Sequence, residues 1–245
     1  MASDKRVRGA YSAGLATRDA ILVAAMRLIA QSGFRGFSLR DLGRAVGVSH
    51  PAVIYHFPSK EALLTAVVKR YEDMVGIFAV DIDERTGRLV EKGLRVKSVL
   101  EWAIQVMRMS NHPEAMLLRD LGIVITVEAA WPEHPAHEHA NYRFHETRVF
   151  IEREIRSLQE RGVISFPINP VTIADAALRE WNGIAVQARY PKGTAETNSV
   201  ADYLAVMAHT MGLPPEYILD LGAMVPSDVA EVFAQALRRY KDMRP

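Results

Sequence analysis

The side chains whose types and spacing could do chemistry form two groups in this sequence, one at 133–145 and one at 49–60. The first group mixes imidazoles with carboxylates, a combination that can bind zinc or iron. Its members are His134, His137, His139, His145, Glu133 and Glu138. Two prolines interrupt the group, its spacings match no standard ligand pattern, and the chain has no Glu-x-x-His pair. We therefore expect loop histidines here, with no metal site and no cofactor.

Catalytic motifs are scarce as well. The chain has no Gly-rich phosphate loop, no Gly-x-Ser-x-Gly elbow and no His-Glu-x-x-His pair. It has no cysteine, which excludes disulfides and Cys-ligated metals and fits a reducing cytoplasm. Its most apolar run, residues 121–127, is too short to span a bilayer, so we expect no membrane partner. These features favour a cytoplasmic protein that is not an enzyme.

The second group of polar residues lies on a predicted pair of short helices. Ser38 and Asp41 have capping-box spacing at the start of the first helix, and Gly47 suits the left-handed residue at its end. Ser49 can cap the second helix. Two short helices joined by a tight glycine turn, here at about 38–57, form a helix-turn-helix, whose second helix can enter a DNA major groove.

Positive charge is concentrated at the same end of the chain. Residues 1–70 contain eleven Lys/Arg and four Asp/Glu, a net charge of +7, whereas the whole chain carries only +1. A basic end on a near-neutral protein suggests a polyanion as its partner. Residues 1–16 include Lys5, Arg6 and Arg8 and lack periodicity, so we expect a flexible basic arm that either reaches DNA or is simply disordered.

The second helix of the pair presents two faces. Val53 and Phe57 point inward at i and i+4, which leaves a polar face for DNA. We assign base contacts to His50 and Tyr55, and a thymine-methyl contact to Ala52. Backbone or phosphate contacts are assigned to Ser49, His56, Arg40 and Lys60.

Residues from about 17 to 71 resemble the DNA-binding domain of TetR-type transcriptional regulators. The matching strings, in fixed order, are Gly33-Phe34, Ser38-Leu39-Arg40-Asp41-Leu42, Gly47-Val48-Ser49, Tyr55-His56-Phe57 and Lys60-Glu61-Ala62-Leu63-Leu64. The family usually has a phosphate-contacting Tyr where this chain has Ile54, so either Tyr55 takes over that contact or it is lost. Over 80–210 a weaker resemblance implies the effector domain of that family, which dimerises and holds a small-molecule pocket.

Helical periodicity governs the chain, and strand signals are almost absent. We predict an all-α fold with a three-helix DNA-binding domain at 17–70 and a helical effector-binding and dimerisation domain at 71–245. Thr17 is the expected cap of the first helix, the fourth helix is expected to reach Val80, and the charged residues 81–93 are expected to form a loop. A helical tail follows from about 213, with no assigned role.

Large or polar side chains on otherwise apolar faces are the candidates for a pocket in the second domain. They are Trp102, Met107, Trp131, Tyr142, Phe150, Trp181 and Asn182, with Asn182 the preferred polar anchor. Ordinary core packing is the alternative for each. Small residues along 170–190 allow close helix approach, which indicates a homodimer reading a palindromic operator, unless they pack only within one chain.

The sequence therefore predicts a homodimeric DNA-binding transcriptional regulator, more specifically a repressor released from its operator by a small-molecule effector. The alternative is an all-helical small-molecule-binding protein or enzyme in which the helix-turn-helix is purely structural.

Overall fold

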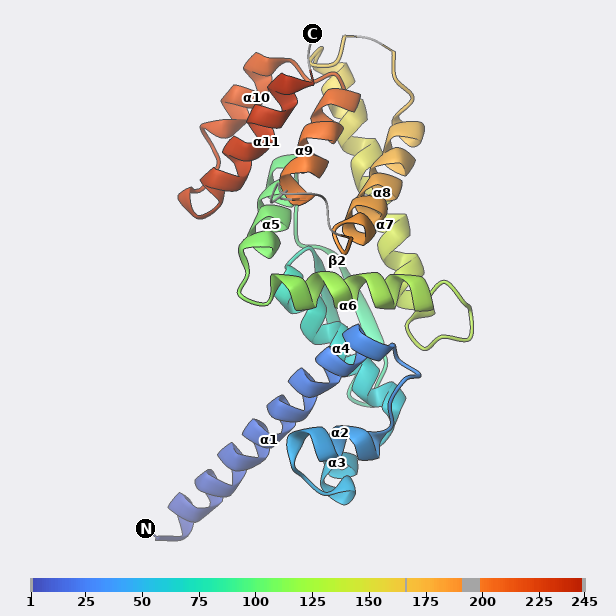
Figure 1. Cartoon of the computed structure of the whole chain (residues 1–245), viewed down its shortest axis with the longest axis vertical. Helices are drawn as coiled ribbons and strands as arrows, with labels where there is room; N and C mark the ends of the chain where they lie inside the picture. Colours follow the sequence, from blue (N-terminus) through green and yellow to red (C-terminus); the bar gives the residue numbers. More distant parts are fainter. Residues whose placement is uncertain (1, 166, 191–198, 244–245) are drawn as a thin grey trace. The chain divides into compact units, whose positions relative to one another are not determined.

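Helices follow one another along the chain in the computed structural model, which describes residues 2–165, 167–190 and 199–243, with a β-hairpin between the fourth and fifth helix (Figure 1). The amino-terminal elements are α1 Ala2–Ser32, α2 Leu39–Val46, α3 His50–His56, α4 Lys60–Val75, β1 Phe78–Ile82 and β2 Leu89–Leu94. The remainder are α5 Val99–Asn111, α6 Ala115–Glu128, α7 His137–Glu160, α8 Pro170–Gln187, α9 Ser199–Thr210, α10 Pro215–Gly222, the 3-10 helix η1 Ser227–Val229 and α11 Ala230–Asp242. The predicted helical fold class is confirmed, apart from the hairpin.

The chain divides into two compact units. The first comprises Met1–Tyr71, Val80–Glu91 and Met116–Ala140, and the second comprises Glu72–Ala79, Lys92–Ala115 and Asn141–Pro245. The first unit is thus larger than the expected DNA-binding domain at 17–70, because it also includes most of α6 and part of the hairpin.

Helix α1 begins at Ala2, so the expected start at Thr17 is wrong. The Thr17 hydroxyl donates to the Ala13 carbonyl oxygen at 2.9 Å, one turn earlier in the same helix, and does not cap it. Residues 2–16 contain no proline and are rich in alanine and basic residues, which favour helix, and they are not the irregular arm that we expected. The side chains of Lys5, Arg6 and Arg8 lie outside the described residues.

The hairpin replaces both the end of the expected fourth helix and the expected loop at 81–93. Helix α4 stops at Val75 because Gly76 adopts φ +73°, a left-handed conformation that ends a helix. Strand β1 then pairs with β2. The turn is closed by the Asp83 carboxylate, which accepts from the backbone N–H groups of Arg85 at 2.9 Å and Thr86 at 2.8 Å. The pattern of apolar residues does not reveal these short strands, because most of their residues are polar or half-exposed.

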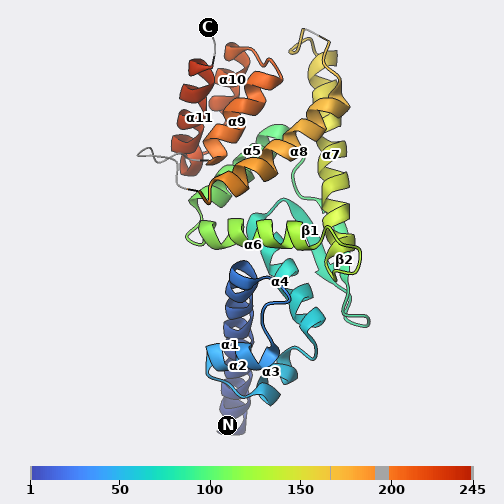
Figure 2. The same ribbon diagram turned by 45° about the vertical axis from the view of Figure 1, so that its right-hand side comes forward.

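The core of the first unit is formed where α1 to α4 meet. Its fully buried side chains include Ile21, Leu42, Val53 and Leu63, one from each of these helices. Figures 1 and 2 show α2 and α3 lying together beside α1. The apolar run at 121–127 lies in α6, as predicted, with Leu121 and Ile125 buried.

Helix α9 is the centre of the second unit. It packs most extensively on α11 and also on α8 and α5, and Figure 2 shows α9, α10 and α11 side by side. Val232 and Tyr240 of α11 are buried, and an ion pair joins Arg239 to Asp202 of α9. The tail from about 213 therefore covers the core of this unit. Within residues 2–165, 167–190 and 199–243, every helix is too short or too polar to span a lipid bilayer.

Candidate functional site

The helix-turn-helix is built by local caps, as the sequence predicted. The Ser38 hydroxyl accepts from the Asp41 N–H at 3.2 Å, and the Asp41 carboxylate accepts from the Ser38 N–H at 2.9 Å. The hydrogen bond from the Ser38 hydroxyl is the main reason that the pKa of Asp41 lies below its ordinary value. Gly47 ends α2 at φ +76°, and the Ser49 hydroxyl caps α3 by accepting from the Ala52 N–H at 3.3 Å. These contacts fix the direction of α3 relative to α2.

Helix α3 is anchored on one side and open on the other. Val53 and Phe57 are buried, and the Arg18 guanidinium lies 4.8 Å from the centre of the Phe57 ring. Tyr55 is 84% exposed and meets the His56 ring edge-on at 5.1 Å between centroids. Among the other predicted DNA-contacting residues, Arg40 and Ser49 are exposed, while His50, Ala52 and His56 are half-buried. The geometry presents an exposed aromatic ring, two imidazoles and a hydroxyl on a rigid seven-residue helix.

Lys60 is placed differently from the other predicted DNA-contacting residues. Its ammonium group donates to the Phe37 carbonyl oxygen and lies 4.3 Å from the Phe37 ring centre and 5.0 Å from that of Phe34. Partial burial lowers the pKa of Lys60. The ammonium is thus held against the loop between α1 and α2. We expected Lys60 to contact a DNA phosphate, whereas in the structure it contacts its own chain.

Glu128, at the end of α6, is a contact that sequence reasoning missed. Its carboxylate accepts from the Phe34 N–H at 2.7 Å, and a Cβ placed on Gly33 would lie only 2.1 Å from a Glu128 oxygen. The His134 ring packs edge-on against Phe34, and its Nε2 lies 3.8 Å from the same carboxylate. Burial lowers the pKa of His134. Glu128 therefore ties α6 to the turn that leads into the helix-turn-helix, and glycine is required at position 33.

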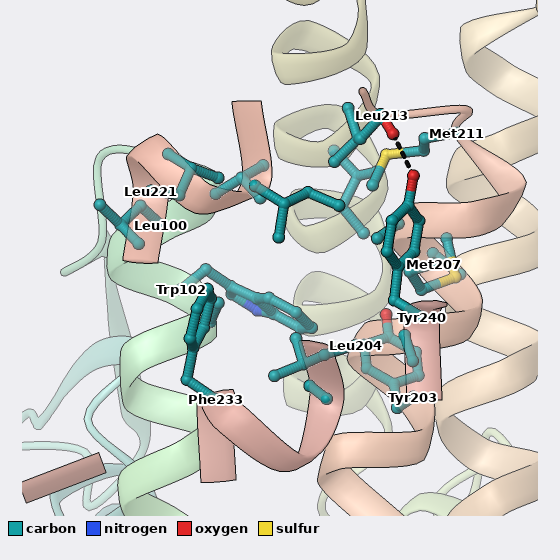
Figure 3. A pocket seen from close by; sticks show the side chains of 18 of the residues that line it. Leu100, Trp102, Tyr203, Leu204, Met207, Met211, Leu213, Leu221, Phe233 and Tyr240 are labelled. Atoms are coloured by element: carbon teal, nitrogen blue, oxygen red, sulfur yellow. Dashed lines mark hydrogen bonds between the residues drawn. The ribbon is translucent and has the colours of Figure 1, made fainter. Parts of the chain in front are cut away.

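A cavity of about 110 Å³ lies within the second unit, lined by residues of α5 and of α7 to α11 (Figure 3). Three of the predicted pocket residues line it, namely Trp102, Met107 and Phe150. The Tyr240 hydroxyl donates to the Leu213 carbonyl oxygen, drawn as a dashed line in Figure 3. The lining is almost entirely apolar, as expected of a site for a small organic molecule.

Residues 21–67 match the model of the family described as bacterial regulatory proteins, tetR family. Over these residues the chain is similar to the TetR family. Over 59 residues it is 42% identical to the HTH-type transcriptional regulator RutR of Escherichia coli K12, a match that covers 24% of this chain and 28% of RutR. The chain thus matches just over a quarter of the length of this curated relative, and the similarity concerns the residues that form the helix-turn-helix and its neighbouring helices.

Solved structures extend the likeness of fold over most of the chain. AibR, solved in complex with isovaleryl coenzyme A and operator DNA, is similar with a TM-score of 0.55 at 17% identity, covering 79% of this chain and 97% of AibR. CprB, a TetR-family protein from S. coelicolor A3(2), gives a TM-score of 0.54 at 19% identity, covering 94% of this chain and 99% of CprB. At these identities the likeness establishes a shared fold.

The other predicted pocket residues do not line the cavity. Trp131 is 63% exposed in the first unit, and Tyr142 packs against Phe78 with ring centroids 6.3 Å apart. Trp181 contacts the Tyr203 ring at 5.2 Å without reaching the lining. The Asn182 amide donates to the Leu178 carbonyl oxygen at 2.9 Å, so it satisfies its own helix and is not a polar anchor for a ligand.

The lining residues that sequence reasoning missed come from α9 and the tail. They include Tyr203, Leu204, Met207, Met211, Phe233 and Leu237. A residue lines a cavity only when distant helices assemble around it, and the sequence does not specify that assembly. The apolar stripe along α11 indicates that this helix packs against another element, and in the structure that element is α9.

The histidines of 134–139 are engaged with separate partners. His137 Nδ1 lies 2.7 Å from the Ala129 carbonyl oxygen, and His139 Nδ1 lies 2.8 Å from the Glu91 carboxylate. His134 Nδ1 accepts from the Ala136 N–H at 3.2 Å. In the part of the chain that the structure describes, no three His, Asp or Glu side chains gather in a way that could hold a metal ion.

Proposed function

We propose that this chain is a TetR-family, sequence-specific DNA-binding transcriptional regulator, and that a small molecule in the second unit controls it. The observation that carries the DNA-binding part is α3, a doubly anchored helix whose exposed face bears Tyr55, Ser49 and the half-buried His50. The net charge of +7 on residues 1–70 supports attraction to a polyanion. In this proposal α3 enters the major groove, with Tyr55 and His50 at the base edges.

The cavity supports the effector part of the proposal. AibR shares the fold of this chain and was solved with both operator DNA and a small molecule. The lining contains no carboxylate, imidazole or amine that could serve as a general acid or base, which favours binding over catalysis. By linkage, if an effector lowers the affinity of the protein for DNA by some factor, bound DNA lowers the affinity for the effector by the same factor. We assign the direction as repression relieved by the effector.

A homodimer completes the proposal, because two copies of α3 are needed to read a palindromic operator. Ala174 and Ala177 of α8 are buried within the chain and do not bear on dimerisation. Ala176, Gly183 and Ala185 remain half-exposed, and a Cβ on Gly183 would meet no atom within 4 Å. Ala176 and Gly183 lie seven residues apart on one face of α8 and support close approach of a second copy, whereas Ala185 lies on the opposite face.

The test is a salt titration of binding to the DNA upstream of the protein's own gene, compared with random DNA of equal length. We expect a preference of at least about 10³-fold and a footprint of paired half-sites. Replacing Tyr55 with alanine should weaken operator binding by about 5- to 150-fold, because a base contact typically contributes ~1–3 kcal/mol. The variant should retain the oligomeric state of the parent in sedimentation.

Tyr190→Ala is the matched control, since Tyr190 is a 69% exposed tyrosine in the second unit. It should leave operator affinity unchanged. Equal affinity for operator and random DNA, or loss of binding in Tyr190→Ala to the same degree as in Tyr55→Ala, would contradict a sequence-reading role for α3.

A further inference from the structure

The lining of the cavity restricts the charge of what it can hold. None of its side chains is a lysine, arginine, histidine, aspartate or glutamate. Transfer of an ion from water into such a site is strongly unfavourable unless the ion is paired and hydrogen-bonded there. A carboxylate, a phosphate or an ammonium ligand would find no partner among these side chains. The occupant is therefore uncharged, which sets this cavity apart from one that takes an anionic coenzyme A ester.

The hydrogen-bonding capacity of the lining is equally restricted. Its polar side-chain groups belong to three rings, namely those of Trp102, Tyr203 and Tyr240. The Tyr240 hydroxyl is already used, since it donates to the Leu213 carbonyl oxygen. The Tyr203 hydroxyl and the Trp102 indole N–H make no hydrogen bond to the described residues. These two rings adjoin, with centroids 5.7 Å apart, so two available donors lie on neighbouring side chains of α5 and α9 (Figure 3).

The Tyr203 hydroxyl stays protonated. Tyr203 is 2% exposed, and this burial raises its pKa well above the ordinary value for a phenol. Because Tyr203 lines the cavity, a ligand oxygen that accepts the proton of this hydroxyl would give it a hydrogen-bond partner. The ligand should therefore carry at least one oxygen acceptor.

The size and shape of the cavity favour a ring. A cavity of about 150 Å³ lined by apolar side chains holds benzene, so about 110 Å³ suits a single ring or a short branched chain. The walls offer aromatic faces from Trp102 and Phe233 and the sulfur atoms of Met207 and Met211, groups that pack well against flat rings.

We propose that the cavity binds a neutral, single-ring compound with one oxygen substituent, of the phenol or cyclic ketone class, and that Tyr203 is the residue that selects the oxygen. This inference rests on the proposed function, because it names the class of effector for the same site.

The experiment measures direct binding of four probes to the full-length protein, without DNA, by calorimetry. Phenol and toluene are matched in size and differ in the oxygen, while benzamide and benzoate are matched in size and differ in charge. We expect phenol and toluene to bind, and benzamide to bind more tightly than benzoate by at least about 10-fold. Tyr203→Phe should weaken the affinity for phenol by about 3- to 10-fold and change the affinity for toluene by less than about 2-fold, because the substitution removes one hydrogen bond and little volume.

Tyr217→Phe is the matched control, because Tyr217 lies on α10 outside the lining and its ring packs against Arg161. It should leave the phenol-to-toluene ratio unchanged. Equal weakening of phenol and toluene by Tyr203→Phe would overturn the role of Tyr203, and benzoate binding as tightly as benzamide would overturn the neutral class. The DNA titration is read separately, so failure of DNA recognition leaves these results intact, and the reverse also holds.

Discussion

The two sites of this chain are built in opposite ways. The candidate DNA-binding surface comes from one contiguous stretch, residues 38–57, in which each cap bonds a residue three positions away. The cavity draws its lining from residues 99 to 240, across helices that are distant in sequence. The first site is exposed and polar, whereas the second is lined by apolar side chains. A local site is specified by the spacing of residues in the sequence, whereas a non-local site is specified by how distant helices pack.

The comparison implies that damage to either site should stay within its own unit. Each unit has its own core, with Phe57 and Leu42 in the first and Met107 and Tyr203 among the fully buried side chains of the second. The following predictions test that independence.

The largest effect is expected from Phe57→Ala. Phe57 is 2% exposed and anchors α3, so its truncation should destabilise the first unit by about 3–5 kcal/mol in denaturant unfolding and abolish operator binding. Binding of toluene in the second unit should persist. Ile54→Ala is the control on the same helix, because Ile54 is 41% exposed and should change stability by less than ~0.5 kcal/mol. Loss of toluene binding in Phe57→Ala would mean that the two units do not fold independently.

Glu128→Ala should lower the free energy of unfolding of the first unit by a smaller amount, about 1.5–3 kcal/mol. The substitution leaves the Phe34 N–H without its charged acceptor. Because Glu128 is the last residue of α6, this variant tests how strongly α6 supports the helix-turn-helix. Operator affinity should fall while phenol affinity is retained, as measured by the DNA titration and calorimetry. Arg119→Ala, on the same helix, removes only a pair with the neighbouring Asp120 at 3.8 Å and is the matched comparison. Operator affinity that is insensitive to Glu128→Ala would contradict the support role.

The sequence predicted the caps of the helix-turn-helix correctly for a physical reason. Ser38, Asp41, Gly47 and Ser49 act through bonds to near neighbours, so their spacing alone specifies the caps that the structure contains. Lys60 was placed wrongly because its long side chain folds back on Phe37, which lies 23 residues earlier in the chain. Spacing within one helix does not report such a contact.

The second unit was predicted in outline only. Helical periodicity identified α5 to α9 and the final helix, but three of seven proposed pocket residues line the cavity. Asn182 looked like a polar anchor on an apolar helix, yet its amide bonds a carbonyl one turn earlier. The hairpin was missed because its strands are short, with five and six residues, and because the positive φ of Gly76 is visible only in the folded chain.

Two glycines allow the same local strain to be compared across the units. Gly47 ends α2 at φ +76° and Gly162 follows α7 at φ +71°, and a Cβ on either would meet no atom within 4 Å. Alanine at either position should therefore cost about 1–2 kcal/mol from backbone strain alone. Gly47→Ala should weaken operator binding and Gly162→Ala should not.

Gly14 lies in the interior of α1 with open space around it. Gly14→Ala should therefore stabilise the protein, by up to ~1 kcal/mol in thermal unfolding.

The smallest effect concerns two exposed carboxylates that differ in their partners. The pKa of Asp41 is lowered chiefly by the Ser38 hydroxyl, and that of Asp228 chiefly by a hydrogen bond from Arg108, whose Nε lies 2.8 Å from the carboxylate. Since each folded-state pKa lies below the ordinary value of 3.8, each carboxylate stabilises the fold above that pH. The stabilisation disappears as the pH falls through the lower, folded-state pKa.

Asp41→Asn and Asp228→Asn should therefore lower the unfolding midpoint at neutral pH and converge with the parent protein as the pH falls through the lowered, folded-state pKa of each carboxyl. Salt separates the two cases. The Asp228–Arg108 pair is an exposed ion pair and should lose most of its contribution at 1 M salt, where the Debye length is about 3 Å. Asp41 is held mainly by the hydroxyl and N–H of one serine, so its contribution should survive. Equal salt sensitivity in both variants would show that the Asp41 cap acts through Arg44, 3.3 Å away, and not through the local bonds that define the helix-turn-helix.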